Sequence, residues 1–153
     1  MFVYLMRHGE AKTEDEDPER GLTDKGFRDV SVAGADARDR GIKPGAIYHS
    51  GKKRAVQTAQ ILSNYVKPEK GVVEAKSLAP MDDPGIWAQR ISGMHEDVML
   101  VGHLPHVAKL GGLLLGRGKG EAVADFKTGE MACLKRCDDD RWVLEWIMVP
   151  ELV

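Results

Sequence analysis

Two segments of the sequence carry histidine beside glycine in settings that suit phosphate chemistry. Arg7, His8 and Gly9 are consecutive, and a second histidine, His103, also follows a glycine. An imidazole can act as a nucleophile near neutral pH, and a guanidinium offers a planar fork of N–H groups that matches phosphate oxygens. Because glycine has no side chain, we expect Gly9 to let backbone N–H groups approach an anion closely.

Arg54 is a further candidate because it lies at the expected start of a helix, where the helix dipole disfavours a cation. An anion bound nearby would offset that cost. The ordinary alternatives are a solvated Arg54 and a His103 that caps the helix following it. These residues therefore predict an anion site if the fold brings them together.

The apolar runs before these residues are typical of buried β-strands. Such runs occupy residues 2–6, 46–48 and 98–101. Ligands of parallel α/β sheets bind beyond the carboxyl ends of the strands. His8, His49 and His103 each follow one of these runs, so we expect them to share one crevice.

Helix signals alternate with the strands. Thr23 is a favourable N-cap, and Phe27, Val30, Gly34 and Ala37 recur after it at helical spacing. Further helices are expected over residues 53–65, after Pro84 and after Pro105, a third strand over 72–78, and a hairpin from 131–136 and 142–149. The pattern predicts one domain over residues 1–153: an α/β fold, a three-layer α/β/α sandwich with a mostly parallel central sheet, helices on both faces and a C-terminal antiparallel hairpin.

Composition limits the classes of partner. The 153 residues are 42% hydrophobic and 30% charged, as in soluble globular domains, and the net charge of -2 makes nucleic acid an unexpected partner. No apolar run is long enough to span a membrane and no secretory leader precedes Arg7, so a cytoplasmic location is expected. Cys133 and Cys137 would lie too far apart along one strand to form a disulfide.

Four motifs occur in an order that resembles the histidine phosphatase superfamily, the phosphoglycerate mutase-like group. They are residues 5–10 (L-M-R-H-G-E), 22–26 (L-T-D-K-G), 50–59 (S-G-K-K-R-A-V-Q-T-A) and 101–103 (V-G-H). R-H-G alone is a weak signal, whereas the ordered set is specific and covers about the first two thirds of the chain. The short length, without a large insertion after Thr58, looks most like the small SixA-type phosphohistidine phosphatases.

The resemblance implies phosphoryl transfer through a covalent intermediate on His8. Arg7, Arg54 and His103 would surround the phosphate oxygens, and Arg20 would add a contact at the mouth of the pocket. A neutral His8 must present one nitrogen to phosphorus, so its other ring nitrogen should donate to a carbonyl or carboxylate. Fixed cations replace Mg²⁺ in this scheme, so no metal and no cofactor is expected.

The leaving group depends on whether a side chain can protonate it. Imidazole, with an ordinary pKa of about 6.5, leaves phosphorus more easily than an alkoxide does. Family members that cleave esters carry an acid after the third strand or directly after the second histidine, where this sequence has Leu104. Asp82 and Asp83 are candidate acids after the third strand, although both also suit a turn. Because Leu104 stands where the ester-cleaving members can carry an acid, the sequence favours a substrate with an N–P bond.

Three functions follow as alternatives. The first is a protein phosphohistidine phosphatase, whose partner would be a phosphorylated protein such as a histidine phosphotransfer domain. The second is a broad-specificity phosphatase of small phosphorylated metabolites, with Asp82 or Asp83 as the acid. The third is a non-catalytic domain that binds an anion, which the presence of His8 disfavours.

The other histidines and one glycine-rich segment have simpler explanations. His95 is expected to face solvent, and His49 to flank the pocket. A zinc site built from His103 and His106 lacks a convincing third ligand. Residues 116–120 (G-R-G-K-G) lack the strand and helix context of a phosphate-binding loop and are expected to form a flexible loop.

Overall fold

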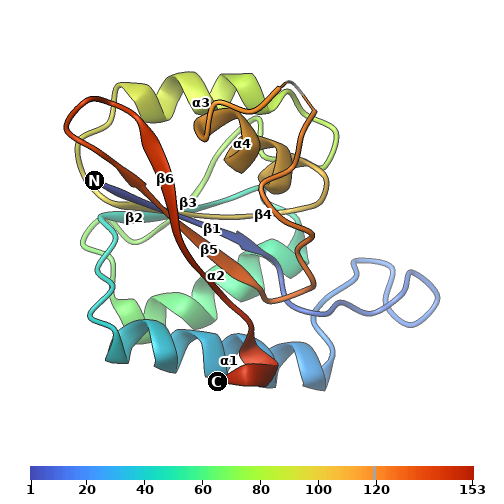
Figure 1. The fold of residues 1–153 in the computed structure, drawn as a ribbon. Coiled ribbons are helices and arrows are strands. Elements are labelled where there is room, and N and C mark those ends of the chain that lie inside the picture. The colour runs from blue at the N-terminus through green and yellow to red at the C-terminus, as the bar shows by residue number, and fades with distance from the viewer. Residues whose placement is uncertain (119) are drawn as a thin grey trace.

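A computed structural model describes residues 1–118 and 120–153 as one mixed sheet with helices on both faces (Figure 1). The strands are β1 (Phe2–Arg7), β2 (Ala46–His49), β3 (Val72–Glu74), β4 (Val98–Gly102), β5 (Met131–Arg136) and β6 (Trp142–Met148). The helices are α1 (Asp24–Asp39), α2 (Lys53–Val66), α3 (Pro84–Ser92), α4 (His106–Leu114) and the 3-10 helix η1 (Pro150–Leu152). Lys119, within the predicted loop 116–120, lies outside the described residues.

The sheet has the order β3-β2-β4-β1-β5-β6, and its pairing confirms the predicted fold class. β1, β4, β2 and β3 are parallel, whereas β5 and β6 are antiparallel. β1 is central because it pairs with β4 on one side and β5 on the other. The carboxyl ends of β1, β2 and β4 therefore meet at one edge of the sheet.

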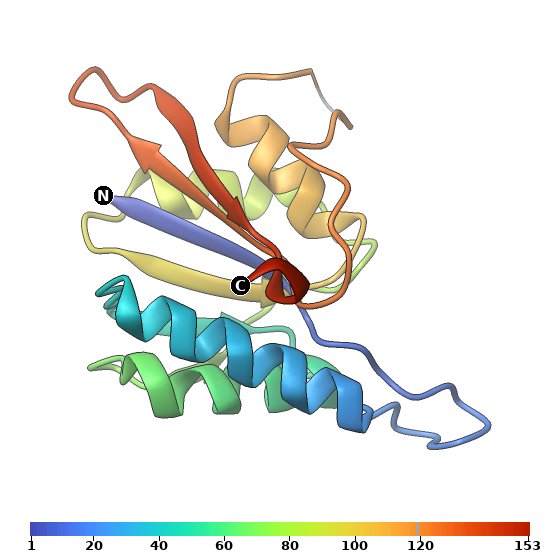
Figure 2. The same cartoon turned by 60° about the horizontal axis from the view of Figure 1, so that its bottom comes forward.

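Alternate residues of each strand enter two separate cores. In β1, Val3 and Leu5 pack with residues of α3 and α4, whereas Tyr4 and Met6 pack with residues of α1 and α2. Figures 1 and 2 show these two helix pairs on opposite faces of the sheet. This covering explains why the parallel strands read as continuous apolar runs.

α1 begins as predicted, with Thr23 Oγ1 accepting the N–H of Gly26 at 3.0 Å. A side chain at Gly26 would collide with the backbone carbonyl of Glu10, so this glycine lets α1 approach the segment after β1. Of the residues that recur at helical spacing, Phe27 is 40% exposed, whereas Val30, Gly34 and Ala37 are buried together with Ala33. The buried stripe runs through Gly26 and Val30, and Phe27 lies about 100° around the helix from Gly26.

The predicted third strand was too long. β3 ends at Glu74 because β2 offers partners only as far as His49, opposite Glu74. The chain then turns, and Ser77 adopts a positive φ of 68°. The segment after β3 therefore leaves the sheet and leads to α3.

Other sequence predictions can be compared directly. Cys133 and Cys137 are both free, and burial raises the pKa of the Cys133 thiol to about 12. Over residues 1–118 and 120–153, no helix combines the length and apolar character needed to cross a bilayer. Residues 10–22, between β1 and α1, project from the body of the molecule as a loop (Figures 1 and 2).

Candidate active site

The fold brings the two predicted reactive histidines together. Arg7 lies opposite Gly102 in the parallel ladder of β1 and β4, so the residues that follow them, His8 and His103, are neighbours. The ring centroids of His8 and His103 are 5.1 Å apart. Of the three histidines expected to share a crevice, His8 and His103 therefore lie together at the carboxyl ends of β1 and β4.

His8 is held in one orientation and kept neutral. Its Nδ1 lies 2.7 Å from the carbonyl oxygen of Gly9, the type of contact predicted for a histidine nucleophile. Nδ1–H donates to this carbonyl, which leaves Nε2 with its lone pair free. The pKa of His8 is lowered to about 4, mainly by burial; the Gly9 carbonyl opposes this effect, and the charges of Arg54 and Arg7 add to it. At neutral pH His8 therefore presents an unprotonated Nε2.

His103 is buried, and one of its ring nitrogens has no hydrogen-bond partner. Its Nε2 lies 2.6 Å from the hydroxyl of Ser50, while Nδ1 is without a partner. The Ser50 hydroxyl already accepts the N–H of Lys52 at 3.3 Å, so its own O–H is available to donate to Nε2. This arrangement places the ring proton on Nδ1 as an unpaired donor. The pKa of His103 is lowered to about 3, mainly by burial and in smaller part by His8 and Arg54.

The two guanidinium groups also contain unpaired donors. The Nε atoms of Arg7 and Arg54 are buried and have no partner, although Arg7 Nη1 donates to the carbonyl of Phe126 at 3.0 Å. Burial lowers the pKa of both arginines, and Arg20 lowers that of Arg54 further. Both remain cations at neutral pH. Buried donors without partners are costly, and an anion would satisfy them.

The start of α2 adds to the same positive field. Arg54 is the second residue of α2, whose N-cap, Lys52, provides no side-chain cap and whose first turn contains no acidic residue. The helix dipole at this end is positive. The placement of Arg54 at a helix start, predicted from sequence, is confirmed.

The expectation for Gly9 was wrong in its physical reason. The Gly9 N–H donates to Thr58 Oγ1 at 3.0 Å and is not available to an anion. A Cβ at position 9 would lie 2.7 Å from Val30 Cγ2, so glycine is required for packing against α1. Thr58 Oγ1 also donates to the carbonyl of Arg54 at 2.8 Å, so this hydroxyl joins the backbones of two site segments.

Sequence reasoning missed the roles of Thr58, Gln57 and Ser50. Gln57 Oε1 accepts the N–H of Leu22 at 2.7 Å, which fixes the end of the projecting loop. The R-A-V-Q-T motif was the available signal for Thr58 and Gln57, and Ser50 was noted only as the neighbour of His49. Their partners lie 35 to 53 residues away in sequence, so spacing alone did not identify them.

Arg20 lies in the projecting loop and its charge reaches the site. Its backbone has a positive φ of 54°, and its Nε donates to the carbonyl of Lys12 at 3.0 Å. Its positive charge lowers the pKa of both His8 and Arg54. Asp17 anchors this loop to α2 through Lys53 at 3.2 Å.

The two aspartates predicted as candidate acids both lie in the turn before α3. Asp83 is the N-cap of α3 and accepts the N–H of Gly85 at 2.9 Å. Asp82 accepts the N–H of Ala79 at 2.9 Å. Both side chains are exposed. The structure thus shows the turn contacts and brings neither carboxylate into hydrogen-bonding contact with His8 or His103.

The remaining histidines divide into three environments. His95 is exposed, as predicted. His49 is buried and its Nδ1 accepts the N–H of Gly51 at 3.0 Å, so it supports the turn before α2. His106 is buried and neither ring nitrogen has a partner. Within the described part of the chain, no three His, Cys, Asp or Glu side chains gather closely enough to hold a metal ion.

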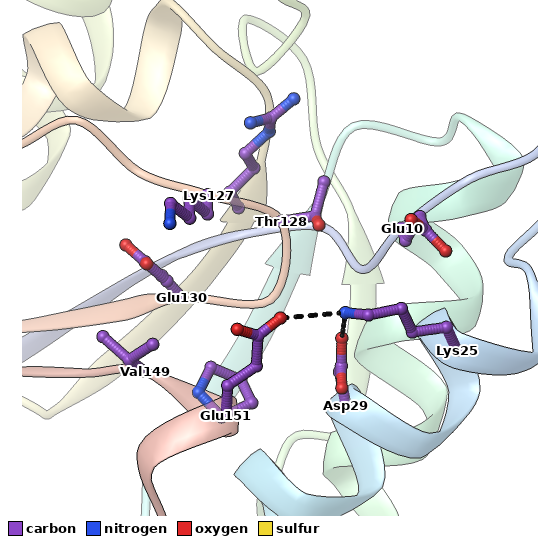
Figure 3. Close-up of a pocket in the computed structure, with 10 residues that line it drawn as sticks. Glu10, Lys25, Asp29, Lys127, Thr128, Glu130, Val149 and Glu151 are labelled. Carbon is purple, nitrogen blue, oxygen red and sulfur yellow. Dashed lines mark hydrogen bonds and ion pairs between the residues drawn. The ribbon is translucent and has the colours of Figure 1, made fainter.

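A cavity of about 410 Å³ borders the site on the α1 side (Figure 3). It is lined by Arg7, Glu10, Lys25, Asp29, Lys127, Thr128, Glu130, Val149, Pro150 and Glu151. Lys25 lies between Asp29 at 2.6 Å and Glu151 at 3.1 Å, so its charge is matched within the protein. Since His8 and His103 are not part of the lining, this cavity is adjacent to the reactive histidines and does not contain them.

Sequence and structure comparisons relate the chain to known proteins. The sequence model of the histidine phosphatase superfamily (branch 1) matches residues 3–103. No curated protein matches the sequence. Among solved structures, the protein histidine phosphatase SixA complexed with tungstate is 23% identical over 99% of each chain, with a TM-score of 0.86.

Two further solved structures share the fold. A protein assigned as the phosphohistidine phosphatase SixA of Agrobacterium tumefaciens is 25% identical over 97% of each chain, with a TM-score of 0.79. Phosphoserine phosphatase from Entamoeba histolytica, in complex with 3-phosphoglyceric acid, is 15% identical over 95% of each chain, with a TM-score of 0.74.

Proposed function

The chain belongs to the histidine phosphatase superfamily, and from this premise we propose that it is a phosphohistidine phosphatase acting through a covalent phosphoryl group on His8. The observation that supports this most is the set of buried, unpaired donors beside a neutral His8. These donors are Arg7 Nε, Arg54 Nε and His103 Nδ1. They come from three segments far apart in sequence, as expected for a site that binds an anion at its centre.

In the first step, Nε2 of His8 attacks phosphorus in line with the bond to the leaving group. The new N–P bond forms as the old bond breaks, and its electron pair departs with the leaving group. Charge on the three equatorial oxygens is stabilised by Arg7, Arg54 and the Nδ1–H of His103. The Gly9 carbonyl stabilises His8 as its ring becomes positively charged.

In the second step, water attacks the phosphoryl group on His8. The N–P bond breaks, inorganic phosphate forms, and the electron pair returns to Nε2. Dividing one displacement into two easier ones is the advantage of a covalent nucleophile. The same donors serve both steps because the equatorial oxygens occupy the same positions.

The nature of the leaving group supports an N–P substrate. His103 is followed by Leu104, and Asp82 and Asp83 each use one oxygen for a backbone N–H of the turn before α3, with no hydrogen bond to His8 or His103. A phosphorylated imidazole needs no strong acid to leave, whereas an alkoxide does. The natural partner proposed is therefore a protein phosphorylated on histidine, such as a phosphotransfer domain. Likeness in fold to SixA agrees with this proposal.

A broad phosphatase of small metabolites is the second candidate. It is favoured by the likeness in fold to phosphoserine phosphatase and requires a side chain that protonates an alkoxide. Asp82 or Asp83 would have to supply that proton.

The two candidates differ in the ratio of kcat/KM for a phosphohistidine peptide to kcat/KM for phosphoserine. The first predicts a ratio far above one, with both activities lost in His8→Ala and retained in the exposed control His95→Ala. Equal or faster turnover of phosphoserine would reject it in favour of the second. Phosphate binding without turnover of either substrate would indicate a non-catalytic anion-binding domain.

A further inference from the structure

A second cavity lies between the loop before α3 and the start of α4. Its volume is about 370 Å³, and it is lined by Pro80, Met81, Asp82, Asp83, Pro84, Pro105, His106 and Lys109. The lining joins the loop before α3 to the first turns of α4. The N–H of Val107 donates to the carbonyl of His103 at 3.0 Å, so the first turn of α4, which lines this cavity, is joined to a residue of the phosphate site.

His106 is the unexplained group in this lining. It is 1% exposed, and neither ring nitrogen forms a hydrogen bond of normal geometry, although a contact with the Ser77 backbone raises the pKa of the ring against the lowering by burial. A buried imidazole normally has a partner for at least one nitrogen. The charge of His106 acts on His103, and the charges of Asp82 and Asp83 act on His106, so the three groups share one local field.

The cavity carries more negative than positive charge. Asp82 and Asp83 line it, opposed by one cation, Lys109. Each aspartate uses one oxygen for a backbone N–H, namely Oδ2 of Asp82 and Oδ1 of Asp83. The other oxygen of each carboxylate has no partner among the described residues. A cationic ligand would suit this field.

We propose that this cavity is the leaving-group subsite and that it selects phosphorylated imidazole in its ring-protonated form. The inference rests on the proposed function and goes further by naming the feature that sets the substrate class. Proton uptake at the ring nitrogen that does not carry phosphorus makes the substrate ring a cation. Attack by His8 then breaks the N–P bond, the electron pair moves to the ring nitrogen, and neutral imidazole leaves.

Asp82 and Asp83 stabilise the cationic ring, and His106 lies beside them in the lining of the cavity. An alkyl phosphate gains nothing from these carboxylates, because its leaving group carries no positive charge. The cavity therefore favours N–P over O–P substrates without a proton-donating carboxyl group. The proton on the substrate ring comes from water.

The test compares phosphoimidazole with phenyl phosphate in wild-type protein and in three variants. Asp82→Asn with Asp83→Asn removes the negative charge but keeps an oxygen for each backbone N–H, since asparagine is also a good N-cap. We expect kcat/KM for phosphoimidazole to fall about tenfold relative to phenyl phosphate. Lys109→Met removes the opposing cation, so the ratio should rise.

Asp138→Asn with Asp139→Asn is the matched control. Asp139 also accepts a backbone N–H, from Arg141 at 3.2 Å, but it lies in the turn between β5 and β6. This double variant should leave the ratio unchanged. A pH profile adds a readout that a purely structural role would not change. In the wild-type protein, kcat/KM for phosphoimidazole should begin to fall at a higher alkaline pH than it does in the Asp82/Asp83 double variant.

The proposal would be overturned if the Asp82/Asp83 double variant left the ratio of kcat/KM for phosphoimidazole to kcat/KM for phenyl phosphate unchanged, whether both activities fell equally or neither fell. Asp82→Asn alone gives the same comparison if the double variant fails to fold. Failure of the proposed function looks different, because phosphoimidazole would then leave no phosphoryl group on His8 of the wild-type protein. Normal labelling of His8 with unchanged ratios in every variant would reject the subsite alone.

Discussion

The two histidines of the active site lie 5.1 Å apart but differ in how the protein holds them. On the α1/α2 side, Nδ1 of His8 contacts the Gly9 carbonyl, and the Gly9 N–H is bound by Thr58. On the α3/α4 side, His103 has one contact, to Ser50, and a buried nitrogen that remains open. We refer to His8, Gly9, Arg54 and Thr58 as the braced half, and to His103, His106, Asp82 and Asp83 as the open half.

The difference follows from what each half must do. A nucleophile must have its tautomer and orientation fixed before the substrate arrives, because each reaction begins there. The groups that receive phosphate oxygens and the leaving group need free donors and acceptors until the ligand supplies the partners. The orientation of His8 is therefore complete within the protein, whereas the donors for the phosphate oxygens, Arg54 Nε among them, and the open half are completed by the substrate.

The largest effect is expected in the braced half from Arg54→Lys, which keeps the charge and removes the planar fork. We expect kcat/KM to fall about 10²–10³-fold, because lysine cannot replace the directed N–H groups around the transition state. Steady-state kinetics with a phosphohistidine peptide measures this. Arg38→Lys on the outer side of α1 is the control. A loss of less than threefold in Arg54→Lys would show that charge alone is sufficient.

Stability should depend on pH because both halves bury a neutral histidine. Burial lowers the pKa of His8 to about 4 and of His103 to about 3, below the ordinary value of 6.5. The unfolded chain therefore binds protons first as the pH falls. The stabilising contribution is complete above pH 6.5 and is lost as the pH falls toward 4, with an expected decrease of about 3 kcal/mol for each histidine.

Urea unfolding at pH 7 and pH 4 in His8→Asn, His103→Asn and the exposed control His95→Asn assigns this decrease to each half. We expect the two site variants to lose part of the pH dependence and the control to keep it. An identical pH dependence in the wild-type protein and in all three variants would contradict the burial of neutral imidazoles.

Thr58→Val tests the bracing itself. Valine keeps the shape but leaves the Gly9 N–H buried without an acceptor, at a cost of about 1–3 kcal/mol in the free energy of unfolding. We expect kcat to fall about tenfold with little change in KM, since His8 loses orientation more than the site loses affinity. Thr58→Ser should restore both values. If Thr58→Val retains full kcat, the bracing serves stability alone.

The smallest effect is expected at Ser50, on the open side. Ser50→Ala removes the contact to Nε2 of His103, so the ring proton is no longer directed to Nδ1. We expect kcat/KM to fall about three- to fivefold, in line with loss of one neutral hydrogen bond. Ser50→Thr should recover activity, and Ser92→Ala on α3 serves as the control. An effect as large as that of Arg54→Lys would show that the open half is also fixed before binding.

The sequence was sufficient to predict that His8 and His103 lie at the same edge of the sheet. A histidine directly after an apolar strand of a parallel sheet must lie at the carboxyl edge, and this placed His8 and His103 correctly. The N-cap at Thr23 and the helix start at Arg54 were also predictable, because capping and dipole effects depend on residues close in sequence.

Features that depend on tertiary approach could not be predicted. Gly9 is glycine because Val30 of α1 packs against it, and Phe27 is exposed because α1 approaches through Gly26. The bridging role of Thr58 depends on a partner 49 residues away. β3 ended early for the same kind of reason, since the length of its neighbour β2 determined where its pairing stops.

The most direct measurement is to identify the phosphorylated residue during turnover. Wild-type protein is mixed with phosphoimidazole, quenched in base within the first turnover and mapped by mass spectrometry. The account predicts one acid-labile, base-stable phosphoryl group on His8, which is absent in His8→Ala. Release of phosphate from phosphoimidazole at an undiminished rate by His8→Ala, with no phosphoryl group on His8 in the wild type, would contradict it.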